Sequence, residues 1–369
     1  MKIIHCADLH LDSKMESNLD REKAVERKSE LFDTFCRMAE YAKLNEVKVI
    51  IIAGDLFDTS KNMQLRVKRR VLSVIRDTPD TDFLYIKGNH DSEDFLEGED
   101  LPENLKLFSR EGRSYEYANV LITGKDYKKG MTEKDWSEFC AKLKNDPEKI
   151  NILVLHEQEG KSFGKEGSVN MSVFKDLNID YLALGHIHSY KCHKLDKRGV
   201  YCYSGCLEGR GFDECGDKGF VLLETEEDQK TGGRLRHSFV PFAKRRIHDL
   251  RLKLDGGYSR EDIEELISEK IKDIPETDMV KLTFSGEVEE DTDIDIEFLQ
   301  KKFGEGFYFM KMCDETKLKL SYEDYENDIS LKGEFIRLVK GKRMREEDKR
   351  EIILMGLRAL SDREIDIWR

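Results

Sequence analysis

The sequence predicts a layered α/β fold in which helices pack against buried strands. The apolar run at 49–52 is rich in β-branched residues and has no polar alternation, which is typical of a strand buried on both faces. Further apolar runs occupy 82–86, 151–155 and 180–184. Segments of helical periodicity separate the first strands. The resulting β-α-β-α-β order is that of a layered α/β domain with helices on the sheet.

The N-terminal elements follow one another closely. We expect strands at 2–6, 47–53 and 82–86, a helix within 20–44, and a second helix at 63–76 that ends before a threonine-proline pair. The first helix is highly charged but carries an apolar stripe at near-helical spacing. This stripe comprises Val25, Leu31, Phe32, Phe35, Met38, Ala39 and Ala42.

Shorter elements complete the first domain, which we place at 1–245. Strand-like segments bounded by glycines are predicted at 115–123, 190–203, 218–224 and 236–241. A helix with a good N-terminal cap is predicted at 132–145.

Composition shifts near residue 245, where a smaller α/β domain is expected to begin. A helix at 259–272, a strand at 279–284, a helix ending near 303 and a strand at 307–312 predict an α-β-α-β capping domain at 246–320. The tail, 321–369, contains two apolar-striped helices, and the second could dock a partner. The stripes comprise Leu331, Phe335, Ile336, Leu338 and Val339, then Ile352, Ile353, Leu354, Leu357 and Leu360.

Composition narrows the class of protein. The 369 residues suffice for two or three domains, and the formal net charge of −13 argues against a broad basic coat, although local basic patches could still meet nucleic acid. No apolar stretch approaches the length of a membrane span. Eight cysteines without a C-x-x-C pair suit reduced thiols, so we expect a soluble cytoplasmic protein without a membrane partner.

Several cysteines lie close together in the sequence. Cys192, His193, Cys202, Cys206 and Cys215 could hold a structural zinc, but their spacings match no common zinc pattern, so we favour no metal there. We also expect His193, His237 and His248 to be structural or surface residues, and His5 to point away from the residues described next.

Potential metal ligands follow five of the predicted strands. They are Asp8 and His10, Asp55, Asn89, His156, and His186 with His188. A buried carboxylate without compensation is costly, so Asp55 at a strand end needs a partner. Strands that each deliver such a residue to one rim predict a polynuclear metal site.

The mixture of oxygen and imidazole donors suits manganese, iron or zinc better than magnesium. The two carboxylate oxygens of Asp55 could bridge two ions. Two ions roughly 3.5–4 Å apart generate hydroxide from water at neutral pH and clamp the attacking and leaving oxygens of a phosphoester. Phosphoester hydrolysis by a two-metal-bound hydroxide is therefore the predicted reaction.

His90 is the predicted catalytic histidine. Because it is the immediate neighbour of Asn89, it should face the substrate instead of the metals and act as a general acid or as a clamp on the phosphoryl charge. Asp91 could orient it. Asp58 is either part of the site or a turn cap.

The same residues carry a family resemblance. Asp8-x-His10, Gly54-Asp55-x-x-Asp58, Gly88-Asn89-His90-Asp91, His156 and Gly185-His186-x-His188 resemble, in order, the signature of the calcineurin-like metallophosphoesterases. The resemblance implies a metallophosphoesterase β-sandwich flanked by helices. It assigns Asp8, His10, Asp55 and His188 to one metal, Asp55, Asn89, His156 and His186 to the other, and His90 to non-ligand catalysis.

A finer resemblance is to the SbcD-like DNA repair exonucleases, especially the YhaO-like branch. It is carried by 4–13, 54–58, 203–214 with Lys218-Gly219, and 331–335. It implies a manganese-dependent nuclease that forms a homodimer and works with an SMC-type ATPase. The chain resembles phosphoprotein phosphatases less, because Asp58 is followed by Thr59-Ser60 and not by their arginine-containing block.

The expected function is hydrolysis of DNA phosphodiester bonds in DNA repair, as an exonuclease, with single-strand endonuclease activity as a further option. Expected cofactors are two divalent ions, Mn²⁺ first and Fe²⁺ or Zn²⁺ as alternatives. Two alternative functions are a phosphodiesterase or phosphatase for nucleotides or another small phosphoester, and a DNA-end scaffold for an SMC-type ATPase. DNA binding needs basic side chains, and the candidates are Arg210, Arg66, Lys68, Arg69 and Arg70.

Overall fold

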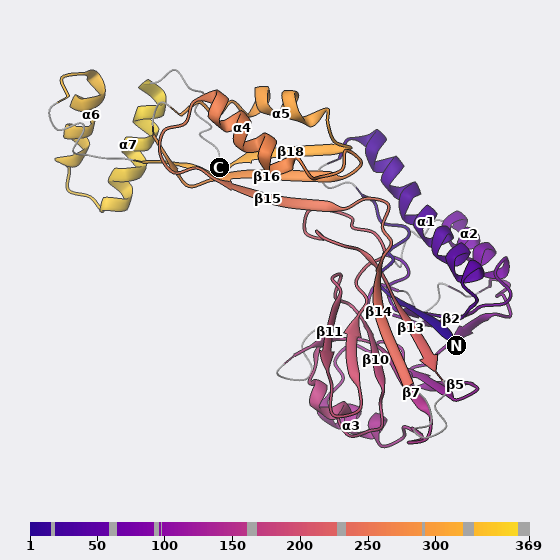
Figure 1. Cartoon of the computed structure of the whole chain (residues 1–369). Helices are drawn as coiled ribbons and strands as arrows, with labels where there is room; N and C mark the ends of the chain where they lie inside the picture. Colours follow the sequence, from indigo (N-terminus) through magenta and orange to yellow (C-terminus); the bar gives the residue numbers. More distant parts are fainter. Residues whose placement is uncertain are drawn as a thin grey trace. The chain divides into compact units, whose positions relative to one another are not determined.

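The computed structural model describes residues 1–15, 19–58, 65–91, 96, 98–160, 168–226, 234–289, 292–319 and 328–360. It divides into two compact units, Met1–His248 and Asp249–Arg369 (Figure 1). The predicted separate tail at 321–369 falls within the second unit. The three-domain division stays a prediction.

Two six-stranded sheets form the first unit. One has the order β14 (Arg234–Pro241), β13 (Gly219–Glu226), β1 (Lys2–Cys6), β2 (Val47–Ala53), β3 (Asp82–Ile86), β4 (Leu105–Leu107). The other has the order β11 (Lys191–Lys194), β12 (Val200–Tyr203), β10 (Tyr181–Gly185), β7 (Ile150–His156), β6 (Val120–Gly124), β5 (Arg113–Tyr117). Strands β1 to β4 are parallel, as are β6, β7, β10 and β12.

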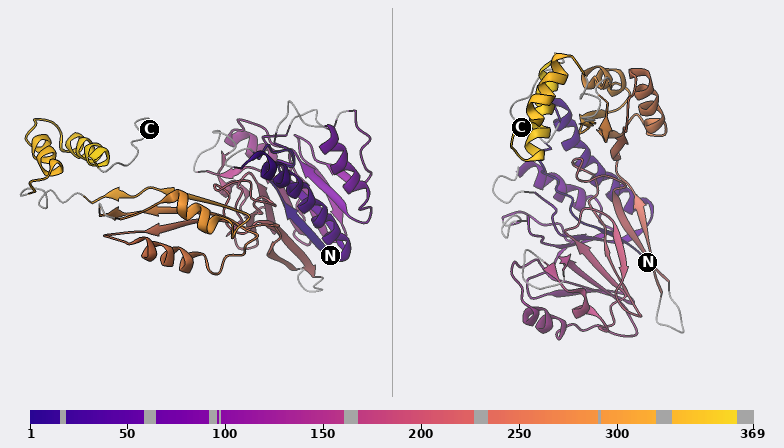
Figure 2. Two further views of the ribbon diagram at one scale, coloured as in Figure 1. Left: turned by 90° about the horizontal axis from the view of Figure 1, so that it is seen from above. Right: turned by 90° about the vertical axis from the view of Figure 1, so that its left-hand side faces the viewer.

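Strand periodicity explains the layers. Alternate residues point to opposite faces of a sheet, so Ile51 of β2 packs between the sheets with Ile152 of β7 and Ala183 of β10. Ile50 of β2 instead packs outward with Phe35 of α1 (Arg21–Leu44). The same outer layer includes α2 (Leu65–Arg76) (Figure 2).

The second sheet has its own outer layer. Leu153 and Leu182 pack with Trp136 of α3 (Glu133–Cys140) and with Phe174 of the 3₁₀ helix η1 (Met171–Phe174). Two short strands, β8 (Gln158–Glu159) and β9 (Ser168–Val169), pair with each other. The unit is a helix-flanked β-sandwich, which confirms the predicted fold class.

Local geometry changes three predicted elements. The segment predicted at 190–203 is the antiparallel hairpin β11–β12. The single strand predicted at 115–123 is the hairpin β5–β6, because Ala118 adopts φ 50° and turns the chain. The helix predicted at 132–145 begins after the Thr132 cap but ends at Cys140. The predicted start of α2 at Met63 lies outside the described residues.

A disulfide joins Cys192 to Cys202. The expectation of eight reduced thiols is therefore wrong for this pair, which neighbouring strands place side by side although ten residues separate them in sequence. The other six cysteines are free.

A buried ion network ties α1 to the loop at 208–214. Arg27 donates to the Gly209 carbonyl at 2.7 Å and contacts Glu30 and Glu208. Glu30 in turn accepts hydrogen bonds from Arg245 at 2.7 Å. Burial alone would raise the pKa of Glu30, but its cationic partners outweigh burial and lower the pKa to about 2.

The second unit contains a small α/β core. Its sheet has the order β15 (Ile247–Lys253), β16 (Met279–Ser285), β18 (Phe309–Asp314), and β16 and β18 are parallel. Helices α4 (Arg260–Ile271) and α5 (Ile296–Gly304) pack on the same face of it, where Ile267 and Leu299 meet Leu282 (Figure 1). Strands β17 (Glu287–Val288) and β19 (Lys317–Leu318) pair beside it.

Two helices end the described chain. α6 (Leu331–Lys340) and α7 (Glu346–Leu360) pack on each other through Ile336, Ile353 and Leu357. Leu331 and Leu338 of α6 remain 67% and 61% exposed. Among the described helices, none is long and apolar enough to cross a membrane.

Replacing Glu30 with glutamine should reduce the free energy of unfolding at pH 7 by about 3–5 kcal/mol, because Arg27 and Arg245 would lose their buried carboxylate. The pKa of Glu30 is lowered on folding, so its contribution is present above the unfolded pKa and is lost as pH falls toward about 2. The difference between wild type and Glu30→Gln should therefore shrink between pH 6 and pH 3. Urea denaturation at both pH values measures it.

The matched control is Glu40→Gln, an exposed position of the same helix, which should change stability by less than about 0.5 kcal/mol. Equal effects of the two substitutions, or a Glu30→Gln deficit that is independent of pH, would contradict the network's role.

Candidate metal centre

All the predicted ligands lie at the carboxyl ends of parallel strands, where ligands of open α/β sheets gather. Strands β1, β2 and β3 lead into Asp8, Asp55 and Asn89, and β7 and β10 of the second sheet lead into His156 and His186. The two sheets therefore present their ligands at one edge of the sandwich. We call this edge, with its candidate ligands, the rim.

Backbone hydrogen bonds join the loops of this rim. Asp8 N donates to the Gly54 carbonyl and His10 N donates to the Asp55 carbonyl, both at 3.1 Å. His186 N donates to both carboxylate oxygens of Asp8, at 3.0 and 3.1 Å. These bonds hold Asp8, His10, Asp55 and His186 at positive φ, a region that non-glycine residues rarely adopt and that often marks functional sites.

Two glycines make the close approach possible. A Cβ on Gly54 would lie 2.2 Å from Nδ1 of His156, and a Cβ on Gly88 would lie 2.2 Å from Oδ1 of Asp55. Any larger residue would push a ligand away from the rim.

One group of ligand atoms comes from Asp8, His10 and His188, which lie within 4.8 Å of one another. Nε2 of His10 is buried and has no hydrogen-bond partner among the described residues. Its contact with Asp55 Oδ2 is 3.9 Å long. An unpaired buried nitrogen is costly, and a metal ion would satisfy it.

A second group surrounds Asn89. Its Oδ1 lies 2.8 Å from Nε2 of His156 and 2.9 Å from Nδ1 of His186. Oδ2 of Asp55 is 3.3 Å from the same His156 nitrogen. Adjacent ligands of a six-coordinate ion with bonds of about 2.1 Å lie about 3.0 Å apart, so these donors fit one divalent ion.

Outer partners fix which histidine nitrogen faces the ligand group, as metal-binding histidines require. Nδ1 of His156 lies 2.8 Å from the Ala53 carbonyl, which leaves Nε2 for the rim. Nδ1 of His188 lies 2.6 Å from Oε1 of Glu214. Glu214 also accepts hydrogen bonds from Arg210 Nη2 at 2.7 Å and from Arg210 N at 2.8 Å.

The buried carboxylates of the rim create an electrostatic field that favours positive charge. Burial would lower the pKa of His156, but the Asp55 and Asp8 carboxylates outweigh it and raise the pKa to about 9. Burial would raise the pKa of Asp55, but the facing His156 and His10 hold it well below its usual range. Divalent cations would occupy the same field, so the donor set and its charge both suit metal binding.

His90 lies beside the ligands with a 47% exposed side chain. Its ring packs edge-to-face on His10, with 5.3 Å between centroids, and its Nδ1 lies 3.3 Å from the Asp58 carbonyl and 3.7 Å from Asp58 Oδ1. Asp91 instead accepts hydrogen bonds from the backbone N–H groups of Gly88 and Phe57.

The predicted orienting role of Asp91 therefore does not match this geometry, because its carboxylate supports the loop backbone. Burial, reinforced by the charge of Asp55, raises the pKa of Asp91 to about 6. Asp58 is the acidic residue that faces His90, and its Oδ1 also lies 3.3 Å from His10 Nδ1 and 3.6 Å from Arg210 Nη1.

The DNA-contact candidates are in unequal environments. The Arg210 side chain is 19% exposed, and its guanidinium forms ion pairs with Glu214 and Asp58. On α2, Lys68 is buried and pairs with Glu99 at 2.9 Å, so it is not part of an exposed basic face. Also on α2, Arg70 covers the Phe32 ring at 3.8 Å, Arg69 lies 3.6 Å from Glu99, and Arg66 is exposed.

Sequence reasoning missed one residue of the site, Glu214. It lies 26 positions from His188 in sequence, in a glycine-rich loop without strand periodicity. The only available signal was an acid four residues after Arg210 in that loop.

Comparisons place the chain among known proteins. The profile of the calcineurin-like phosphoesterase family matches residues 1–190. The DNA double-strand break repair protein Mre11 of Sulfurisphaera tokodaii is 28% identical over 308 residues, which are 76% of this chain and 76% of that protein. The uncharacterized metallophosphoesterase YhaO of Bacillus subtilis is 30% identical over 274 residues, which are 68% of this chain and 61% of that protein. A solved dimetal phosphatase from Danio rerio has a TM-score of 0.43 and 11% identity, with 64% of this chain and 95% of that chain covered, and is too distant to carry an argument.

The family profile covers more than half of the chain and ends just after His188. It therefore contains all of the candidate ligands, whereas Arg210 and Glu214 lie beyond it. The chain is a metallophosphoesterase and belongs to the calcineurin-like phosphoesterase family.

Proposed function

We propose that this chain is a metal-dependent DNA nuclease, foremost an exonuclease, that hydrolyses phosphodiester bonds in DNA repair. The observation that carries the proposal is the rim itself, where ligand-type side chains from both sheets converge beside a half-exposed histidine. The similarity to the Sulfurisphaera DNA double-strand break repair protein supports DNA as the substrate. It also supports placing this chain near the SbcD-like nucleases.

We assign the ligand roles as follows. One ion would be held by Asp8, His10, Asp55 and His188, and the other by Asp55, Asn89, His156 and His186, with manganese as the proposed metal. When bound, such ions lower the pKa of water and stabilise charge on phosphoryl oxygens.

The protein's own proton donor is His90. Asp58 faces Nδ1 of this ring, so an N–H there would be directed at Asp58 and Nε2 would face the substrate. Protonated His90 would then give its Nε2 proton to the departing oxygen of the DNA strand. General acid catalysis of this kind contributes about 10²–10⁴-fold in rate.

Glu214 would act as a positioning residue. It holds Nδ1 of His188, so that Nε2 of that ring faces Asp8. Arg210 shares this carboxylate and is also directed toward Asp58. Arg210 could therefore meet a substrate phosphate next to the ligands, where a pocket lined by Ser13, Met15 and Asp213 opens.

The proposed partners are DNA and an SMC-type ATPase. Exposed Arg66 and Arg69 on α2 offer charge for DNA backbone contacts. The apolar side chains Ile352 and Leu360 of α7, each 39% exposed, support docking of an SMC-type ATPase by the second tail helix, as predicted from the sequence. Homodimerisation and a cytoplasmic location remain predictions.

The first test is hydrolysis of end-labelled duplex and single-stranded DNA with and without Mn²⁺, run beside bis-p-nitrophenyl phosphate. We expect metal-dependent degradation of DNA because the rim's donors need a cation to organise a phosphodiester. If bis-p-nitrophenyl phosphate is hydrolysed while the DNA stays intact in every lane, the nuclease proposal is contradicted and a phosphodiesterase for small substrates is favoured. If neither substrate is hydrolysed, a DNA-end scaffold is favoured.

His90→Ala should slow DNA cleavage by about 10²–10⁴-fold but slow bis-p-nitrophenyl phosphate hydrolysis much less. The reason is that p-nitrophenolate leaves without needing a proton, whereas the DNA oxygen does not. Rates on both substrates at saturating Mn²⁺ measure the difference. The control is His193→Ala, an exposed histidine on β11. An equal loss on both substrates would rule out the general-acid role.

Glu214→Gln should weaken Mn²⁺ binding about 10–100-fold, because the amide orients His188 less strongly than the carboxylate. Activity should recover when Mn²⁺ is raised by the same factor. Activity measured as a function of Mn²⁺ concentration gives the shift, with Glu224→Gln on β13 as the matched control. A lower maximal rate with an unchanged Mn²⁺ midpoint would contradict the positioning role.

A further inference from the structure

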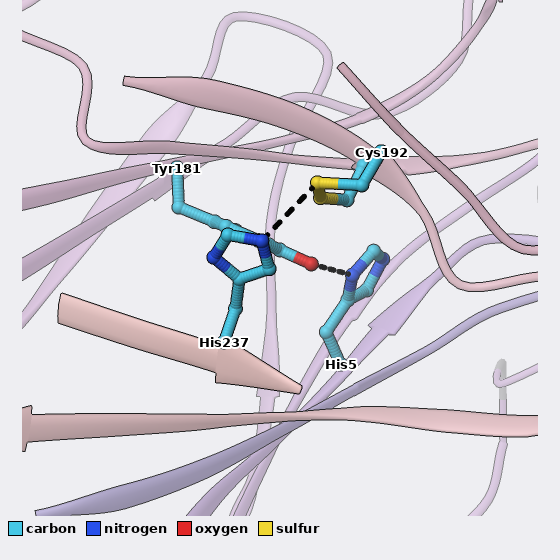
Figure 3. The surroundings of a disulfide bond; sticks show 5 residues. His5, Tyr181, Cys192 and His237 are labelled. Atoms are coloured by element: carbon cyan, nitrogen blue, oxygen red, sulfur yellow. Dashed lines mark hydrogen bonds between the residues drawn. A yellow bond between two sulfur atoms is a disulfide. The ribbon is translucent and has the colours of Figure 1, made fainter. Parts of the chain in front are cut away.

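A second group of metal-ligand side chains lies where the two sheets meet at their edges, away from the rim. Cys192 of the edge strand β11 pairs directly with Cys202 of β12, and His237 comes from β14, the edge strand of the other sheet. One ligand atom from each of the three residues lies within 4.8 Å of the others. Figure 3 shows the His237 ring directed at the two sulfur atoms.

The separation of the donors fits a tetrahedral ion. Cys192 Sγ lies 3.4 Å from His237 Nε2. Zinc bonds of about 2.3 Å to sulfur and about 2.0–2.1 Å to nitrogen, at tetrahedral angles, place such a pair about 3.6 Å apart. The disulfide sulfur carries no proton and is a weak acceptor, so a hydrogen bond alone is a weak reason for this contact.

The two sulfur atoms can reach the same geometry after reduction. Tetrahedral zinc would place them about 3.8 Å apart. The Cα atoms of Cys192 and Cys202 lie 4.1 Å apart, so both side chains can reach one ion. Rotation of the Cys192 and Cys202 side chains can therefore open the site without separating β11 from β12.

The surroundings leave one side of the group open. Cys202 is buried, Cys192 is partly buried and His237 is exposed. On the buried side, Tyr181 packs 6.0 Å from the His237 ring, and its hydroxyl lies 2.9 Å from Nδ1 of His5. Burial lowers the pKa of His5 to about 3, so this neighbour is neutral.

We propose that Cys192, Cys202 and His237 form a zinc site that a thiol–disulfide change controls. A dithiol reductant gives two electrons and two protons to the disulfide, so the S–S bond breaks, two thiols form and the reductant becomes a disulfide. Zinc then displaces one proton from each thiol into solvent. Both thiolates, His237 Nε2 and a water molecule on the open side complete four ligands.

The proposal uses only two cysteines of the cysteine-rich segment and adds His237, which is exposed as expected. Cys206 and Cys215 are not part of the group, since Cys206 Sγ contacts the His188 carbonyl and Cys215 Sγ the Phe212 carbonyl. The third ligand comes from β14, which no local spacing indicates. Because it would join strands of both sheets, bound zinc should stabilise the edge of the sandwich.

Cobalt is the probe, because thiolate-to-cobalt charge-transfer absorption reports sulfur ligands and the oxygen and nitrogen donors of the rim do not produce it. The full chain is reduced with a phosphine, which takes up oxygen from water as it reduces the disulfide, and is then desalted and titrated with Co²⁺. We expect the band in reduced wild type, its removal by Zn²⁺, and its absence in oxidised protein. His237→Ala should weaken Co²⁺ binding at least about 10-fold.

Four variants assign the absorption band to its ligands. It should disappear in Cys192→Ser and persist in the control Cys140→Ser, which removes a free cysteine elsewhere. The band should also persist in Asp55→Asn, which removes the carboxylate proposed to bind both ions at the rim. The cobalt result is therefore independent of nuclease activity. No band in reduced wild type, or a band that survives the double substitution Cys192→Ser, Cys202→Ser, would overturn the proposal. Hydrolysis of bis-p-nitrophenyl phosphate by the cysteine variants confirms that they fold.

Discussion

The buried carboxylate of Asp55 is the group around which the candidate site is organised. It is 1% exposed, accepts a hydrogen bond from His90 N and faces His156 from the other sheet. Its own carbonyl accepts from His10 N. An anion at this depth is tolerated only when compensated, so the chain segments that follow β1, β2, β3 and β7 all meet at it.

A second layer of ion pairs connects this centre to the surface of the first unit. His188 is held by Glu214, and Glu214 is held by Arg210 in the same glycine-rich loop. That loop is in turn fixed to α1 by Arg27, which donates to Gly209. The helix closest to the N-terminus thus contributes to the rim although none of its residues is a candidate ligand.

The strands and the candidate ligands that follow them could be predicted, because strand periodicity is visible within a short stretch of sequence. The runs before Asp8, Asp55, Asn89 and His156 identified buried strands, and their parallel order explains why the ligands share one rim. Features that depend on tertiary contacts escaped prediction. Glu214, 26 residues from the histidine it orients, is one of them.

Side-chain environments were equally hidden from the sequence. Lys68 stands in a basic run but is buried against Glu99. His237 is exposed, as predicted, but its place beside the Cys192–Cys202 pair depends on β14, a strand of the other sheet. The role of Asp55 is tested most directly by the metal content of wild type and Asp55→Asn after loading with Mn²⁺ and gel filtration, with Asp33→Asn as control. We expect two ions per wild-type chain and the loss of both in Asp55→Asn, whereas retention of two ions by Asp55→Asn would contradict the assignment of Asp55 to both ions.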